Sequence, residues 1–220
     1  MKINWYVAMP QDFLARYVIL SFYFIFLIMP SSVYAQLPYE CGSLENAYGP
    51  FDYTNPRHFN EKLGIVEKGH FPKYVENLEH GKAGSLASDL DYVLRAFPNH
   101  HRALNSMSKY ALKKNAKKTR YTIDCYFMRA RYFAPSDGKV LVIQGIYEFK
   151  QKKWKEAIEA FEEAAQYMPE NSEIYYNLGL TYIKLEKYDL AQKMADKAYG
   201  LGYPMSGLRE ALKKVRSSVD

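Results

Sequence analysis

The second half of the chain repeats itself at an interval of 34 residues. Gly145 and Gly179 are one interval apart, and so are Phe127 and Phe161. The further pairs at this interval are small, aromatic or proline residues: Trp154/Tyr188, Ala157/Ala191, Ala130/Ala164, Ala164/Ala198 and Pro135/Pro169. A fixed period of this length is typical of a solenoid, in which each unit packs against its neighbours and a continuous core runs through the stack.

Each unit has the pattern of two amphipathic helices. Tyr175, Leu178, Gly179 and Tyr182 fall on one helical stripe, and the glycine lets a paired helix approach closely. The preceding helix ends before Pro169. One unit further upstream the interval lengthens to 37 residues, which indicates a three-residue insertion, in the pairs Leu86/Ile123, Leu90/Phe127, Val93/Ala130 and Pro98/Pro135.

These residues resemble the tetratricopeptide repeat, with Tyr175 in place of its usual tryptophan and Ala157, Phe161 and Pro169 at matching positions. The resemblance implies an all-α fold, a solenoid of helix pairs. It places two well-formed repeats at 138–204, degenerate helical repeats at 67–137 and a capping helix at 205–220. Gln144 and Glu148 depart from the pattern, because the family has leucine and tyrosine there.

The first 66 residues differ in kind from the repeats. Lys2 and Arg16 flank a charged start, 17–29 is an unbroken apolar run, and small side chains precede Gln36. This layout predicts a signal peptide over 1–35 and a periplasmic or extracellular protein with no stable membrane span after cleavage; an uncleaved anchor is the alternative. Residues 36–66, rich in proline and aromatic side chains, are expected to form an irregular arm. Segments 48–53 and 98–104 also resemble uncharacterised exported repeat proteins of Gram-negative bacteria, which have no assigned activity.

Cys41 and Cys125 are the two cysteines of the chain. An even number of cysteines in an oxidising compartment favours a disulfide. The alternative is that Cys125 is a small buried apolar residue inside a helix.

Two surfaces are candidates for binding. On the first helix of each well-formed repeat, side chains that point away from the packing stripe line the concave groove of a solenoid, and we expect a partner segment or the aromatic arm 48–53 of the same chain to fill it. The groove residues are Val142, Ile146, Phe149, Lys150, Tyr176, Leu180, Ile183 and Lys184. The second candidate is a basic patch for an acidic partner or an anionic polymer, or else a solvated loop: Lys113, Lys114, Lys117, Lys118 and Arg120.

No catalytic motif, metal-ligand spacing or cofactor-binding sequence is present, so the chain is not expected to be an enzyme, to hold a metal or to need a cofactor. The net charge of +6 is spread too thinly to predict nucleic-acid binding. Three functions follow as hypotheses: a non-catalytic protein-interaction module of the cell envelope, a self-assembling structural subunit that uses its N-terminal arm, and an accessory to an envelope polysaccharide or secretion system.

Overall fold

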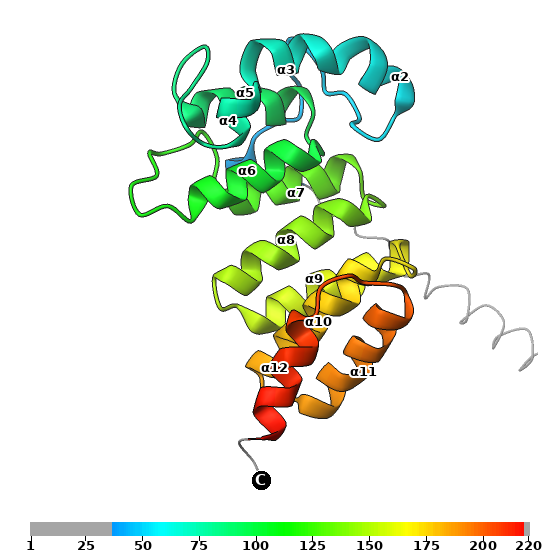
Figure 1. The fold of residues 1–220 in the computed structure, drawn as a ribbon. Helices are drawn as coiled ribbons and strands as arrows, with labels where there is room; N and C mark the ends of the chain where they lie inside the picture. Colours follow the sequence, from blue (N-terminus) through cyan, green and yellow to red (C-terminus); the bar gives the residue numbers. More distant parts are fainter. Residues whose placement is uncertain (1–36, 218–220) are drawn as a thin grey trace, which may run out of the picture. The chain divides into compact units, whose positions relative to one another are not determined.

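The computed structural model describes residues 37–217, and within them the chain is helical and has no β-strand (Figure 1). The signal segment predicted over 1–35 lies outside the described residues. None of the helices in the described part has the length and apolar content that crossing a bilayer requires.

Two helix pairs form the C-terminal half of the stack. Helix α8 (Gly138–Lys150) packs along α9 (Trp154–Tyr167), and α10 (Ser172–Lys184) packs along α11 (Tyr188–Gly200). Helix α9 also contacts α10, so the two pairs share one core. Asp137 and Asn171 cap α8 and α10, since their side chains accept from the backbone N–H two residues on. The all-α fold of stacked helix pairs that the 34-residue period predicts is confirmed.

The next helices toward the N-terminus are shorter. Helices α5 (Leu86–Ala96), α6 (His101–Ala111) and α7 (Ile123–Phe133) have 11 residues each. A long loop, 112–122, joins α6 to α7, whereas the corresponding loops of the C-terminal pairs are 151–153 and 185–187. The insertion inferred from the 37-residue interval therefore falls within the stretch that contains this loop.

Helix α12 (Gly207–Arg216) follows the last pair and packs on α10 and α11. Its own side chains Leu208 and Leu212 are buried against these helices. Leu208 occupies the space over Gly179, where an added methyl group would lie 2.5 Å from its Cδ2 atom. Gly179 thus admits α12 more closely than it admits its pair helix α11, whose nearest atom, the carbonyl oxygen of Ala191, is 3.4 Å away.

The N-terminal arm is less irregular than expected. It starts with η1 (Tyr39–Cys41), but a continuous helix then runs through α2 (Pro56–His58), the π-helical η2 (Phe59–Leu63) and α3 (Gly64–His70), followed by the short α4 (Lys73–Glu76). The prediction of an irregular segment to residue 66 is wrong after Asn55. The side chain of Asn55 caps the helix by accepting from Arg57 N–H, and Pro56 occupies its first turn, where proline is favoured.

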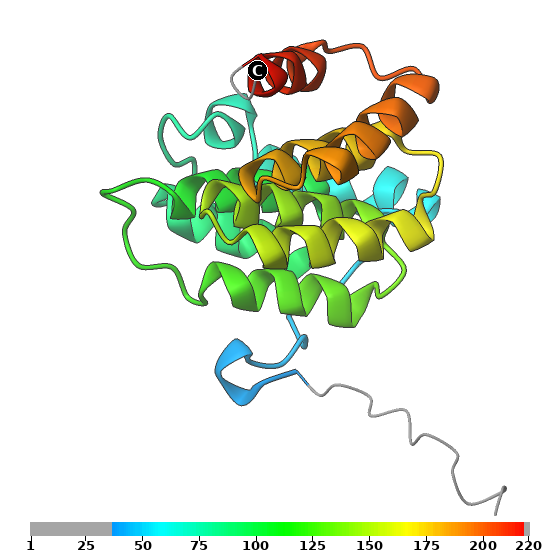
Figure 2. The same ribbon diagram turned by 90° about the horizontal axis from the view of Figure 1, so that it is seen from below.

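The arm is fastened to the helices of its own chain. Cys41 and Cys125 form a disulfide between η1 and α7. The buried guanidinium of Arg129 donates from Nη1 to the carbonyl oxygens of Cys41 and Ser43, at 2.8 and 2.7 Å. Figure 2 shows η1 on the opposite side of the helices from α12. The start of the arm, η1, is thus held on the side away from α12.

Candidate interaction surface

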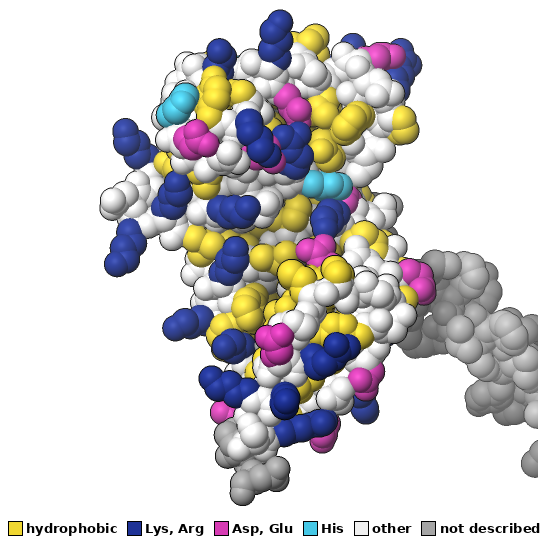
Figure 3. Space-filling model, viewed as in Figure 1, with side chains coloured by type: hydrophobic (Ala, Val, Ile, Leu, Met, Phe, Trp, Pro, Cys, Tyr) yellow, Lys and Arg dark blue, Asp and Glu magenta, His cyan; other side chains and the backbone are white. Residues whose placement is uncertain are grey.

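The first helices of the successive pairs lie next to one another: α6 contacts α8, α8 contacts α10, and α10 contacts α12. Figure 1 views the molecule from the side on which α12 lies. In the same view, Figure 3 shows apolar side chains at the surface between α6 and α12, with lysine and arginine side chains gathered along the left edge.

Four apolar side chains of the predicted groove lie partly exposed on α8 and α10. Ile146 and Phe149 of α8 recur one repeat later as Leu180 and Ile183 of α10, and all four pack against the core of these helices. The ring of Phe149 also meets Trp154 edge-on, with 5.0 Å between the ring centroids. Each helix thus keeps apolar surface in contact with water at equivalent positions.

Lys150 and Lys184 follow these apolar residues at the C-terminal ends of α8 and α10. Both are exposed, and within residues 37–217 neither forms an ion pair. At the other end of the same helices, Lys139 Nζ lies 2.6 Å from Glu173 Oε2, so that cation is already neutralised by the neighbouring helix. Lys150 and Lys184, the cations left for an external anion, therefore lie at the C-terminal ends of α8 and α10.

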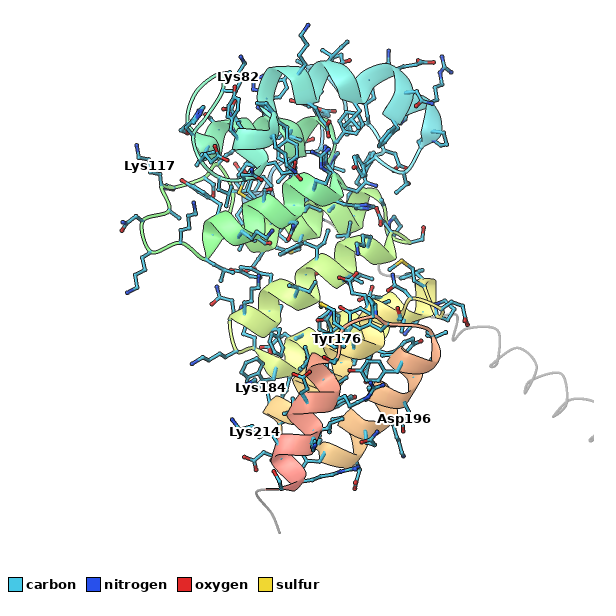
Figure 4. All side chains as sticks on the ribbon, viewed as in Figure 1. Lys82, Lys117, Tyr176, Lys184, Asp196 and Lys214 are labelled. Atoms are coloured by element: carbon cyan, nitrogen blue, oxygen red, sulfur yellow. A yellow bond between two sulfur atoms is a disulfide. The ribbon has the colours of Figure 1, made fainter. Side chains whose placement is uncertain are left out.

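Two residues predicted to line the groove are buried, and this part of the prediction needs correction. Val142 has no exposed surface and Tyr176 retains 8 %. The ring of Tyr176 stacks on Tyr203, with 4.2 Å between the centroids, and its hydroxyl lies beside Gly207 at the start of α12 (Figure 4). The C-terminal segment of the chain, 201–208, therefore covers Tyr176 and shortens the open surface.

The aromatic arm does not fill the groove either. Phe51 packs on Phe97 at the end of α5, and its N–H donates to the carbonyl oxygen of Ala96 at 2.8 Å. Tyr53 lies against the imidazole of His100 at the start of α6, with 4.4 Å between the ring centroids. The alternative in which residues 48–53 occupy the face of α8 and α10 is therefore wrong.

The five cations of the predicted basic patch lie on the α6–α7 loop, and all are exposed. Lys113 Nζ donates to the carbonyl oxygen of Leu78, and Arg120 Nε lies 3.7 Å from Asp91 Oδ2. Figure 4 shows Lys117 pointing away from the helices. The structure thus brings the patch together on one loop, apart from the groove residues of α8 and α10.

A polar contact joins α3 to the start of α6, and the sequence did not reveal the pairing of Glu67 with His100. His100, which has no exposed surface, accepts at Nδ1 from Ala103 N–H and lies 3.0 Å from Glu67 Oε1 through Nε2. Burial lowers the pKa of His100 below its usual range, although the Glu67 carboxylate opposes the shift. With both ring nitrogens bonded and the side chain buried, this histidine caps α6 and holds α3 against it.

The neighbouring histidines have similar structural partners. His101 Nε2 lies 2.8 Å from Asp137 Oδ2, and His70 Nδ1 lies 2.9 Å from Asp89 Oδ1. Among residues 37–217, no group of three or more histidine, cysteine or acidic side chains is placed to hold a metal ion.

Two buried polar atoms on α8 lack hydrogen-bond partners among the described residues: Gln144 Oε1 and Glu148 Oε2. These are the two positions where the sequence departs from the repeat pattern. Burial raises the pKa of Glu148 above its usual range, and the nearby ammonium of Lys153, 3.4 Å away, opposes that shift. Gln144 is therefore accommodated at the cost of an unsatisfied acceptor, whereas Glu148 Oε2 keeps the ammonium of Lys153 as an ion-pair partner.

Comparison with known families agrees with the fold. Residues 145–186, from the middle of α8 to the turn after α10, match the family model described as TPR repeat, where TPR stands for tetratricopeptide repeat. No match to a curated protein was found.

Proposed function

Because this chain carries repeats of the tetratricopeptide family, we propose that it is a non-catalytic protein-interaction module that binds a segment of a partner protein across α8 and α10. The observation that carries the proposal is the recurrence of one surface pattern on adjacent helices. Ile146, Phe149 and Lys150 of α8 reappear as Leu180, Ile183 and Lys184 of α10.

The pattern also specifies the partner's chemistry. Partly exposed apolar side chains gain free energy when a partner's apolar residues cover them. Lys150 and Lys184 lie at the same end of their helices and have no acidic partner within the described chain, so they favour acidic residues in the bound segment. We infer a segment with apolar residues along α8 and α10 and an acidic residue near the two lysines.

We further propose that binding takes place outside the cytoplasm, after cleavage of residues 1–35. The apolar run 17–29 with its flanking basic residues supports export. The disulfide between Cys41 and Cys125 supports it independently, because such bonds persist in oxidising compartments. N-terminal sequencing of the protein recovered from producing cells is expected to begin at Gln36, and an intact Met1 would contradict the proposal.

Site-specific photocrosslinking tests the binding surface. A photoreactive residue at Ile183, on the proposed surface, is compared with one at Leu190, an exposed position on α11. We expect a crosslinked partner from Ile183 only, and we expect Lys150→Glu with Lys184→Glu to remove it. Equal crosslinking from both positions, or a product that survives the charge reversal, would refute the proposed surface.

A further inference from the structure

The loop between α6 and α7, residues 112–122, is unusually long for this chain and lies outside the proposed partner surface. The corresponding loops of the next two pairs connect their helices with 151–153 and 185–187. A close helix pair does not require the extra length, because three residues suffice twice in the same chain.

The loop is held in place by its own side chains. The hydroxyl of Tyr110, on the last turn of α6, accepts from Lys117 N–H at 2.8 Å. Thr119 Oγ1 donates to the carbonyl oxygen of Tyr121, and the guanidinium of Arg129 lies 4.8 Å from the Tyr121 ring centroid. Because these contacts fix both halves of the loop, the space beneath it is preformed.

That space is a cavity of about 210 Å³ between α6, the loop and the start of α7. Apolar and aromatic side chains make up much of its lining: Met107, Tyr110, Ala111, Ala116, Tyr121 and Ile123. A dry apolar cavity of about 150 Å³ is large enough to bind benzene. The pocket beneath the loop is larger and partly open to solvent, so a small ring or a short alkyl chain can enter it.

The remaining lining is polar and consists of Thr119, Thr122 and three basic side chains. Lys117, Lys118 and Arg120 border the cavity, and no acidic side chain does. The dipole of α6 does not account for Lys117 and Lys118, because the helix ends at Ala111 and the dipole acts within about one turn of the helix end. Arg120 Nε already lies 3.7 Å from Asp91 Oδ2, whereas Lys117 and Lys118 form no ion pair among the described residues. An apolar pocket with two unpaired cations at its border matches a ligand that has an apolar body and an anionic group.

We propose that this cavity binds an amphiphilic anion, with an alkyl chain or ring between α6 and α7 and a carboxylate or phosphate at Lys117 and Lys118. Such an anion can be a free fatty acid or the acyl chain and headgroup of a membrane lipid. The site is independent of the surface on α8 and α10, so either proposal can fail while the other stands.

Sodium octanoate is the first probe, and the methyl resonance of ¹³C-labelled Met107 is the readout in the full chain. We expect a saturable shift of Met107 and no shift of Met194, which lies on α11. Octylammonium, with the same chain and the opposite charge, should leave Met107 unshifted. Vesicles of phosphatidylglycerol distinguish a membrane source from a free anion.

Two variants separate the roles of charge and cavity. Lys117→Gln with Lys118→Gln should weaken octanoate binding about tenfold, whereas the matched control Lys213→Gln with Lys214→Gln on α12 should not. Ala116→Phe should fill the cavity and abolish the Met107 shift, and circular dichroism checks that each variant is folded.

Equal shifts with octanoate and octylammonium, no shift at all, or binding that survives Ala116→Phe would overturn the proposal. Vesicle binding that Ala116→Phe abolishes would support it and identify the source as a lipid. If the lysine variant abolishes vesicle binding and Ala116→Phe leaves it intact, the cavity proposal is overturned. The loop would then bind membranes through its charge alone.

Discussion

Replacing Gly145 by alanine tests the close packing within the repeat. A methyl group added there would lie 2.6 Å from Cε1 and 2.9 Å from Cζ of Phe161, a ring with no exposed surface. Alanine favours a helix interior over glycine by about 1 kcal/mol. Forcing a methyl group into a packed core costs about 1–3 kcal/mol. We therefore expect Gly145→Ala to lower the free energy of unfolding by about 1 kcal/mol, because the packing cost exceeds the helix gain.

Gly64→Ala is the matched control. Gly64 lies within the continuous helix after Pro56, and a methyl group there would meet nothing within 4 Å. The same substitution should therefore raise the stability, by up to about 1 kcal/mol. Denaturant unfolding followed by circular dichroism at the helix band measures both changes, and the expected signs are opposite.

Repeating the Gly145→Ala substitution in a Phe161→Leu variant shows whether the Phe161 ring causes the loss of stability. In a Phe161→Leu chain the ring is gone, so Gly145→Ala should no longer destabilise, and the double-mutant cycle should give a coupling of about 1 kcal/mol or more. If Gly145→Ala stabilises the chain as much as Gly64→Ala does, the proposed contact between α8 and α9 is refuted.

Three further outcomes follow from the structure. Replacing Cys41 and Cys125 by serine should cost about 4.5 kcal/mol in the chain-entropy model, since the disulfide closes a loop with a sequence separation of 84. Urea unfolding with and without reductant measures this loss. Burial and the Glu162 carboxylate raise the pKa of Tyr182 to about 12, so the folded chain holds a proton that the unfolded chain loses near pH 10; stability should fall between pH 10 and 12, and less in Tyr182→Phe. Gln144→Leu removes a buried unpaired acceptor and should raise the free energy of unfolding by about 1 kcal/mol in the same assay.

The sequence by itself determined the repeating architecture. Phe161, Gly145 and Gly179 recur at the packing positions of the helix pairs, and the structure places them against one another or against the next helix. Such positions are visible in a sequence because packing permits few residue types there, so that small and aromatic residues return with the period. The end of α9 before Pro169 follows from a local rule as well.

Which surfaces stay open was decided by the tertiary structure. Tyr176 and Ile183 lie two turns apart on α10, yet Tyr176 is covered by Tyr203 and α12, whereas Ile183 remains partly exposed. Periodicity describes one unit and its neighbours and cannot show what a terminal segment covers. The sequence also left open whether the arm fills the groove, because the position of the arm depends on Cys41, Arg129 and Ala96, which are far apart in the sequence.

The cavity beneath the α6–α7 loop depends on the local sequence and on the tertiary structure. The 37-residue interval marked an insertion and the run of cations a basic patch, but neither showed that Tyr110 holds Lys117 beside a largely apolar pocket. A local pattern records which residues each helix must bury. An enclosed volume arises only when segments distant in sequence meet, because its size depends on how closely their backbones can approach.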